Sequence, residues 1–452
     1  MPLPPGPRTP SLWQAWTWIR RPLPLLDRCA RRFGGRFTLR IGPQAMVVVS
    51  DPEDVRAAFT ATPEVLETGG ARRYLRPFLT DGSNLVMDGE EHRRHRRLLL
   101  PPFHGERMRA YGDVMRETAA RAVATWPVGR PFRAIEPLRR ITQDVIFQAI
   151  FGVRDEARRE ELRRETEAFF ARVPQLLLFI PALRIDLGPL SRWGRFLRRR
   201  RAIFASFQRE IDRARAGNGG DGGAGGGGGE REDVLALLVR NGGHAADPLQ
   251  DHEIRAELVT LLVAGHESLT AALAWALQWI LATPGVLDRV RAELREVCGG
   301  GPPETAHLAR LRYLEAAILE TLRVSPPFPV VLRRAPQATA IGGVEIPAGA
   351  MVAPCPYLAH RRPETHPDPE RFDPERFLGE RRPGPFEYFP FGGGNRLCVG
   401  LSFATYEMKA VIATVLARAD LALAAPATRE TRRKGILLEP EHGTPVVVVR
   451  RV

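Results

Sequence analysis

The feature that most restricts the fold of this chain is a nearly continuous apolar stretch at residues 256–283. A transmembrane helix needs about 20 apolar residues, so the stretch is long enough to cross a membrane. Glu257, His266 and Glu267 interrupt it, however, Pro284 closes it, and a glutamate inside a span is costly in lipid. A helix that is apolar on all sides is otherwise the core helix of a large protein. We therefore predict a buried central helix without a transmembrane span, whose polar interruption has a function, because buried polar groups usually have a partner.

The rest of the chain is long enough to surround such a helix. Its 452 residues allow one large domain or several small ones. Helical periodicity prevails up to residue 325, and a capped helix is predicted at residues 51–59. Alternating apolar residues predict short strands at residues 36–42, 45–50, 339–357 and 435–452. Residues 217–229 are almost all glycine, so we expect a disordered linker within a single domain that spans residues 1–452.

The net charge of +14 raises the question whether the partner is a nucleic acid or an anionic membrane. The basic residues are nearly all arginine and are scattered among acids, and no nucleic-acid-binding motif is present, so we exclude nucleic acid. Residues 1–21 are rich in proline and lack the apolar run of a signal peptide. We therefore expect a cytoplasmic protein.

The four cysteines of the chain include no Cys-x-x-Cys pair, which favours a reduced compartment and argues against structural zinc. Cys398 alone follows a run of glycines and Arg396 and precedes a predicted helix at residues 400–419. A helix start and nearby cations both lower the pKa of a thiol. We therefore predict that Cys398 binds a ligand as a thiolate, with a buried structural cysteine as the alternative.

Three motifs in fixed order surround this cysteine. The spacing Phe-x-x-Gly-x-Arg-x-Cys-x-Gly occupies residues 391–400, Glu320 and Arg323 are three residues apart, and Pro-Glu-Arg-Phe occupies residues 374–377. With these motifs the chain resembles the cytochrome P450 family of haem-thiolate monooxygenases, over essentially its whole length. The resemblance implies a mainly α fold with small β-sheets and haem b (iron protoporphyrin IX) between the central helix and the cysteine loop with its helix. It also implies that Glu320 and Arg323 pair with Arg376 in a structural triad needed for folding.

The resemblance assigns Cys398 as the ligand of the haem iron, because a thiolate pushes electron density to iron and favours O–O cleavage. Gly394 and Gly400 would let backbone N–H groups approach the sulfur, and Phe391 would shield it from water. Further residues would bind the haem propionates: Arg396, His92, Arg96 and Arg333. His92 and Arg96 are four residues apart and so share a helix face, although the family often has tryptophan at the position of His92. His95 and Arg334 are expected at the surface or behind these contacts.

The polar interruption of the central helix matches the family's oxygen-activation motif. Ala264 and Gly265 are small and would leave room for dioxygen, the co-substrate. Glu267 and Ser268 form an acid–alcohol pair able to relay protons. The family usually has threonine where this chain has Ser268, and serine lacks the methyl group that limits rotation. The alternative is a serine bonded back to its own helix carbonyl.

Family alignment assigns the substrate pocket to mainly apolar positions, which implies a lipophilic substrate held by burial. They are Asn84, Leu85, Val86, Leu177, Val263, Phe328, Val330 and Leu437. Residues 175–190 would form the mouth of an access channel, with ordinary helix core as the alternative. The arginines at residues 195–201 are interpreted as a solvated face, and a weak peripheral membrane contact near the mouth is left open.

We therefore predict a bacterial-type monooxygenase that inserts one oxygen atom from dioxygen into a C–H bond. Electrons from NAD(P)H would arrive through a separate ferredoxin or flavodoxin with its reductase, and Arg93 and Arg97 would help to dock this partner. Residues 101–112 and 262–268 resemble bacterial and cyanobacterial enzymes that act on long-chain fatty acids or terpenes. We expect a monomer. The alternatives are an H2O2-dependent peroxygenase and a non-catalytic haem sensor or carrier.

Overall fold

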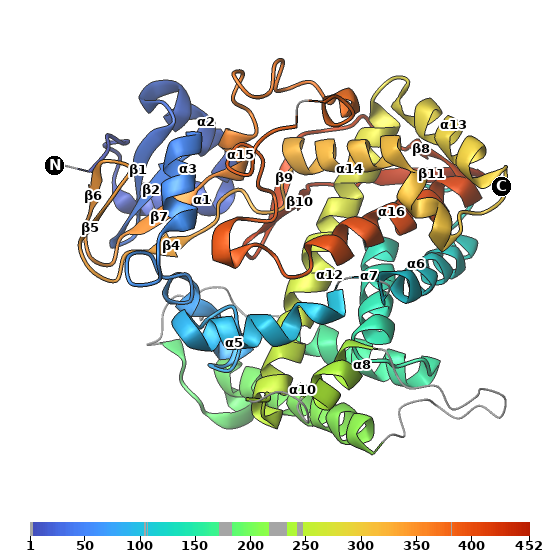
Figure 1. Ribbon diagram of the computed structural model, residues 1–452, viewed down its shortest axis with the longest axis horizontal. Helices are drawn as coiled ribbons and strands as arrows, with labels where there is room; N and C mark the ends of the chain where they lie inside the picture. The colour runs from blue at the N-terminus through green and yellow to red at the C-terminus, as the bar shows by residue number, and fades with distance from the viewer. Residues whose placement is uncertain are drawn as a thin grey trace.

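The computed structural model describes residues 3–103, 105, 107–170, 183–216, 233–241, 247–380 and 382–452. Figure 1 shows a mainly helical molecule whose largest sheet lies at one end, beside the N-terminal helices. The predicted mainly α fold with small β-sheets is confirmed. The glycine-rich residues 217–229 and Leu177 lie outside the described residues.

The described helices account for most of the molecule. They are α1 (Ser11–Arg20), α2 (Pro22–Phe33), α3 (Pro52–Thr60), α4 (Arg76–Leu79), α5 (Gly89–Leu99), α6 (Arg107–Ala124), α7 (Ile135–Ala149), α8 (Glu156–Phe170), α10 (Arg192–Arg215), α11 (Val234–Asn241), α12 (Asp251–Ala282), α13 (Val286–Cys298), α14 (Arg312–Val324), α15 (Pro356–Ala359) and α16 (Leu401–Arg418). The helix predicted at residues 51–59 is α3, but the prediction that it is capped is wrong. The side chain of Asp51 makes no cap hydrogen bond and pairs with Arg362 instead.

The described strands form small sheets in the order β1-β2-β7-β4, β3-β11-β8, β10-β9 and β5-β6. They are β1 (Arg36–Ile41), β2 (Gln44–Val49), β3 (Phe132–Arg133), β4 (Arg333–Arg334), β5 (Thr339–Ile341), β6 (Val344–Ile346), β7 (Met351–Pro354), β8 (Ala419–Leu423), β9 (Thr431–Lys434), β10 (Leu437–Pro440) and β11 (Pro445–Arg451). β1 pairs antiparallel with β2, and β2 runs parallel to β7. All four predicted strand regions therefore contain strands, whereas β3, β4, β8 and β9 were not predicted.

The central helix α12 runs through the middle of the molecule (Figure 1) and packs against α7, α14, α16 and β10. Gln250 and Glu253 form a capping box at its start. By length and hydropathy α12 is the one helix among the described residues that could cross a membrane, but 67% of its most apolar window is buried inside the protein. The core helix of a large protein passes the same test, and the prediction of a buried central helix is confirmed.

The pair Glu320–Arg323 on α14 fastens this helix to residues 360–373. Both side chains are fully buried, and Arg323 donates to Glu320 at 2.7 and 2.8 Å. Arg376, on the 3-10 helix η6 (Pro374–Phe377), places its Nε 3.5 Å from Glu320 Oε1. The structure thus brings together the three residues of the predicted triad.

Candidate active site

The cysteine loop packs against the end of α3, and this packing explains its glycines. The loop contains the 3-10 helix η7 (Gly394–Arg396), and the N–H of Cys398 donates to the carbonyl of Phe391 at 3.1 Å. Gly394 has φ +66°, and a Cβ there would lie 2.1 Å from the carbonyl oxygen of Phe59. Gly394 is therefore required for close packing rather than for access to the sulfur. Gly400 differs, because its backbone N–H points to the Cys398 thiol.

Two residues that were predicted at the haem site, Cys398 and Ala264, are exposed. Ala264 is exposed although it lies in the middle of α12 between buried residues. Cys398 is exposed as well, yet burial of its thiol raises the pKa, and Gly400, Arg96 and Arg72 oppose this shift only in part. Burial therefore outweighs the nearby cations at this thiol, whereas a coordinated metal deprotonates a thiol outright.

Buried cations gather near Cys398. Among the residues that the structure describes, the buried Nη2 of Arg333, on β4, has no hydrogen-bond partner. Burial, together with Arg72 and Arg396, lowers its pKa to about 9. Burial lowers the pKa of Arg396 to about 10, with Asp88 opposing and Arg72 adding to the shift. Such mutual repulsion is relieved by anions, and the two carboxylates of a haem fit this requirement.

His92 and Arg96, the other residues predicted to bind the propionates, differ in their environment. His92 is buried, and burial together with Arg396 and Arg96 lowers its pKa to about 3, so its imidazole is neutral. A neutral imidazole keeps one N–H to donate. Arg96 instead donates its Nη1 to the carbonyl of Leu397 at 2.7 Å and so fastens α5 to the cysteine loop.

Arg72 joins this cluster without having been predicted. It lies on the 3-10 helix η1 (Gly70–Leu75), and its charge acts on Arg333, Arg396 and Cys398. Burial lowers its own pKa, and Tyr74 and Asp88 oppose this shift. No motif spacing in the sequence distinguishes Arg72 from the neighbouring arginines.

The acid and the alcohol on α12 have separate partners. Ser268 Oγ donates to the carbonyl of Ala264 at 2.6 Å, which is the back-bonded arrangement. Glu267 accepts from Lys434 Nζ at 2.6 Å through both oxygens, and His266 Nε2 lies 3.2 Å away. Burial would raise the pKa of Glu267, but His266 and Lys434 outweigh it and hold this pKa well below its usual range. Glu267 is therefore a carboxylate fixed by β9.

Three described segments of the predicted pocket meet near α12. The backbone N–H of Asn84 donates to Glu257 at 2.8 Å, and Leu85 and Val86 join the same core cluster as Val263. The N–H of Leu438, next to Leu437, donates to the carbonyl of Pro327, next to Phe328, at 2.8 Å. Val330 is half-buried and packs against the apolar cluster of α2, β1 and β2.

Comparisons with known proteins agree with this geometry. The family model for cytochrome P450 matches residues 4–445. Cytochrome P450 135B1 of Mycobacterium tuberculosis is 34% identical over 99% of this chain and 92% of the relative. Cytochrome P450 138 of the same organism is 36% identical over 99% of this chain and 97% of the relative. The chain belongs to the cytochrome P450 family, whose members are haem-dependent oxidoreductases of the monooxygenase class.

Solved structures give the same fold. The retinoic acid-bound cyanobacterial CYP120A1 superposes with a TM-score of 0.83 at 25% identity, covering 100% of both chains. The haem domain of cytochrome P450DA superposes with a TM-score of 0.83 at 24% identity, covering 100% of this chain and 98% of the other. The second likeness concerns the fold alone.

Proposed function

We propose that this protein inserts one oxygen atom from dioxygen into a C–H bond of a lipophilic substrate, with electrons from NAD(P)H delivered by a separate partner. The observation that carries the proposal is the gathering of buried arginines near Cys398, where Nη2 of Arg333 has no hydrogen-bond partner among the described residues. Cys398 would hold the haem iron, and Arg333, Arg396, His92 and Arg72 would hold the propionates. When bound, a haem with a thiolate ligand supplies the activation of dioxygen.

Proton delivery would depend on Ser268 and Glu267. The hydroxyl of Ser268 lies next to the exposed Ala264 and must leave the Ala264 carbonyl to donate elsewhere. Glu267 is ionised and held by Lys434, so it can accept a proton from solvent only as that ion pair loosens. Such positioned groups typically contribute roughly 10²–10⁴-fold to a rate.

The substrate would be a long, apolar molecule such as a fatty acid or a terpene. Leu85, Val86, Val263 and Leu437 are apolar and lie at buried or half-buried positions near α12. A pocket lined in this way binds by burial of apolar surface. The retinoic acid bound to the cyanobacterial relative, an elongated isoprenoid, supports this class.

The electron donor would be an acidic ferredoxin or flavodoxin that docks on α5. Arg93 and Arg97 are exposed on this helix and contact only Glu90 among the ion pairs of the described residues, at 2.6 and 3.6 Å. Exposed ion pairs are weak, so an acidic partner can replace Glu90. The docking should weaken as salt is added.

The test is product formation by the haem-loaded protein with dioxygen, NADPH, a surrogate ferredoxin and its reductase. Lipophilic compounds that shift the Soret band on titration are used as substrates, and the product is expected to carry one oxygen atom from ¹⁸O-labelled dioxygen. Product formed only with hydrogen peroxide would identify a peroxygenase. Binding without any product under either condition would identify a sensor or carrier.

A further inference from the structure

A buried chain of acids and a histidine connects α5 to α12. His95 is fully buried on α5, and its Nδ1 lies 2.7 Å from Oε1 of the fully buried Glu257. The other ring nitrogen, Nε2, lies 3.1 Å from Glu253 Oε1, one turn earlier on α12. A histidine between two carboxylates donates to both only when both of its nitrogens carry protons.

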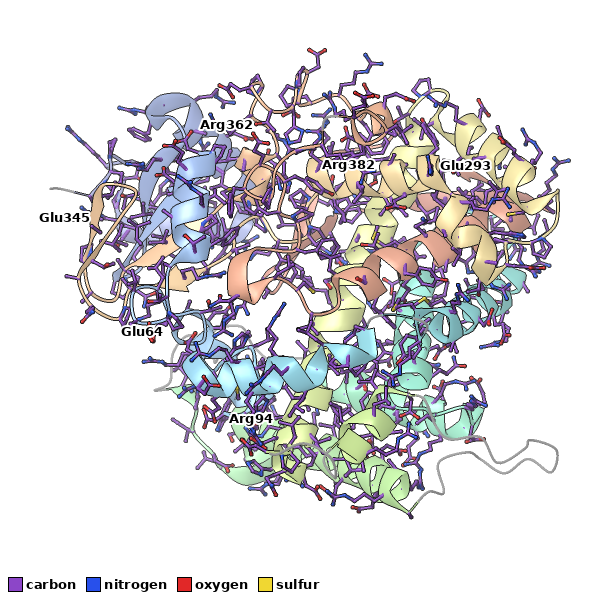
Figure 2. The ribbon with its side chains drawn as sticks, in the orientation of Figure 1. Glu64, Arg94, Glu293, Glu345, Arg362 and Arg382 are labelled. Atoms are coloured by element: carbon purple, nitrogen blue, oxygen red, sulfur yellow. The ribbon has the colours of Figure 1, made fainter. Side chains whose placement is uncertain are left out.

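The outer end of this chain is neutralised by an arginine. Arg94, labelled in Figure 2, donates to Glu253 at 2.7 and 3.1 Å and contacts Asp247 at 2.7 Å. Glu253 also accepts from the backbone N–H of Gln250 at 2.7 Å. The inner Glu257 contacts no arginine or lysine within the described ranges of the chain, and His95 is the ionisable group with which it pairs.

The inner end of the chain reaches the propionate arginine through one residue. Glu257 Oε1 accepts from the backbone N–H of Asn84 at 2.8 Å, and the carbonyl of Asn84 accepts from Arg396 Nη1 at 3.0 Å. Glu257 Oε2 is buried and has no hydrogen-bond partner among the described residues. A separate hydroxyl bond at 2.6 Å, from Thr260 to Ser83, ties the same loop to α12 without involving Arg396.

The groups around His95 and Glu257 decide how this buried chain of acids and a histidine responds to pH. Burial disfavours the imidazolium, but Glu257 and Glu253 outweigh it and raise the pKa of His95. Burial raises the pKa of Glu257, and His95 and Asn84 oppose this in part. Both shifts mean that the folded protein holds protons here more tightly than the unfolded chain. The protonated, paired His95 therefore stabilises the fold. This contribution is full below about pH 6.5 and is lost as the pH rises through the raised pKa of His95.

We propose that Glu257 and His95 are positioning residues that share a proton and, through the backbone of Asn84, hold Arg396 where it meets a haem propionate. Haem retention then weakens when the pair loses its proton. This inference rests on the proposed haem site.

The test measures how fast the ferric, haem-loaded protein loses haem to excess apomyoglobin, from about pH 6 to about pH 9. Glu257→Gln keeps an oxygen that can accept from Asn84 but removes the charge that pairs with His95. Thr260→Val is the matched control, because it loosens the same loop at Ser83 and leaves the pair intact. The wild type is expected to lose haem faster as the pH rises. Glu257→Gln should lose haem roughly tenfold faster at neutral pH and should have lost the alkaline acceleration, whereas Thr260→Val should retain it.

His95→Gln provides a second variant in case Glu257→Gln does not fold, and it should also lose the alkaline acceleration. The inference is overturned if either variant keeps the pH profile of the wild type, or if Thr260→Val flattens the profile as much. The carbonyl complex of the reduced wild type reports separately on the haem site. A wild type that binds no haem would defeat the proposed function, whereas normal haem binding with unchanged profiles would defeat only this inference.

Discussion

Two buried groups of charges in this protein differ in how completely they are paired. Around Arg323 all five N–H donors have acceptors, two on Glu320 and three on backbone carbonyls, at 2.7 to 3.0 Å. Around Arg333 one nitrogen has no partner among the described residues, and the nearby Arg72 and Arg396 repel it. A saturated group stabilises the fold by itself. A group with more cations than anions is destabilising until a ligand of the opposite sign binds.

The largest effect should follow from breaking the saturated group. Arg323→Ala leaves Glu320 buried with Arg376, 3.5 Å away, as its remaining cation among the described residues, which costs about 3–5 kcal/mol and is comparable to the stability of a whole domain. We expect little folded protein, measured as the yield and the urea midpoint by circular dichroism. Arg376→Ala is the control, because Arg376 lies 3.5 Å from Glu320 and is partly exposed. An Arg323→Ala protein as stable as the control would contradict the distinction.

Removing an arginine from the unsaturated group around Arg333 should not destabilise the haem-free protein. Arg333→Ala removes one of several mutually repelling cations, so the haem-free protein should keep or increase its melting temperature. Affinity for haem should fall by roughly tenfold or more, because a charge-assisted hydrogen bond to a propionate is lost. Thermal unfolding without haem and haem titration measure the two effects. A haem-free variant that melts well below the wild type would place Arg333 with the structural group.

A smaller effect is expected at Glu267, which is paired but only partly enclosed. Its depressed pKa means that this pair contributes stability above the unfolded pKa of about 4.3, and loses it as the pH falls toward the folded value. Lys434→Gln should therefore lower the melting temperature slightly at neutral pH and by a similar amount near pH 4, roughly, and the loss should shrink only as the pH falls further toward the folded pKa. Lys434 is itself well exposed, so the effect should be about 1 kcal/mol or less. A loss that stays undiminished at the lowest pH at which the protein folds would show that packing of β9, and not charge, is responsible.

Features that depend on residues close together in the sequence could be predicted. Cys398, Arg396 and the pair Glu320–Arg323 belong to motifs in which a few neighbouring residues define the local geometry. The central helix was predictable for a similar reason, since a long apolar stretch with charged interruptions has few other solutions.

Contacts between distant segments could not be predicted. Arg72 lies near Arg333 and Arg396 because η1 folds against β4, and Lys434 meets Glu267 because β9 pairs with β10, which packs beside α12. Val330 packs against the apolar cluster of α2, β1 and β2, although family alignment assigned it to the substrate pocket. In each case tertiary packing decides which face of a short segment is used, and no local pattern records it.

The central claim is that Cys398 binds a haem iron and that nearby arginines bind the haem propionates. The most direct measurement is the absorption spectrum of the reduced carbonyl complex of the haem-loaded wild type and of Cys398→Ser. The wild type should show the strongly red-shifted Soret band of a thiolate-ligated haem, and the serine variant should lose it, because a hydroxyl is a poor donor to iron compared with a thiolate. A red-shifted band that persists in Cys398→Ser would assign the ligand to another residue and contradict the account.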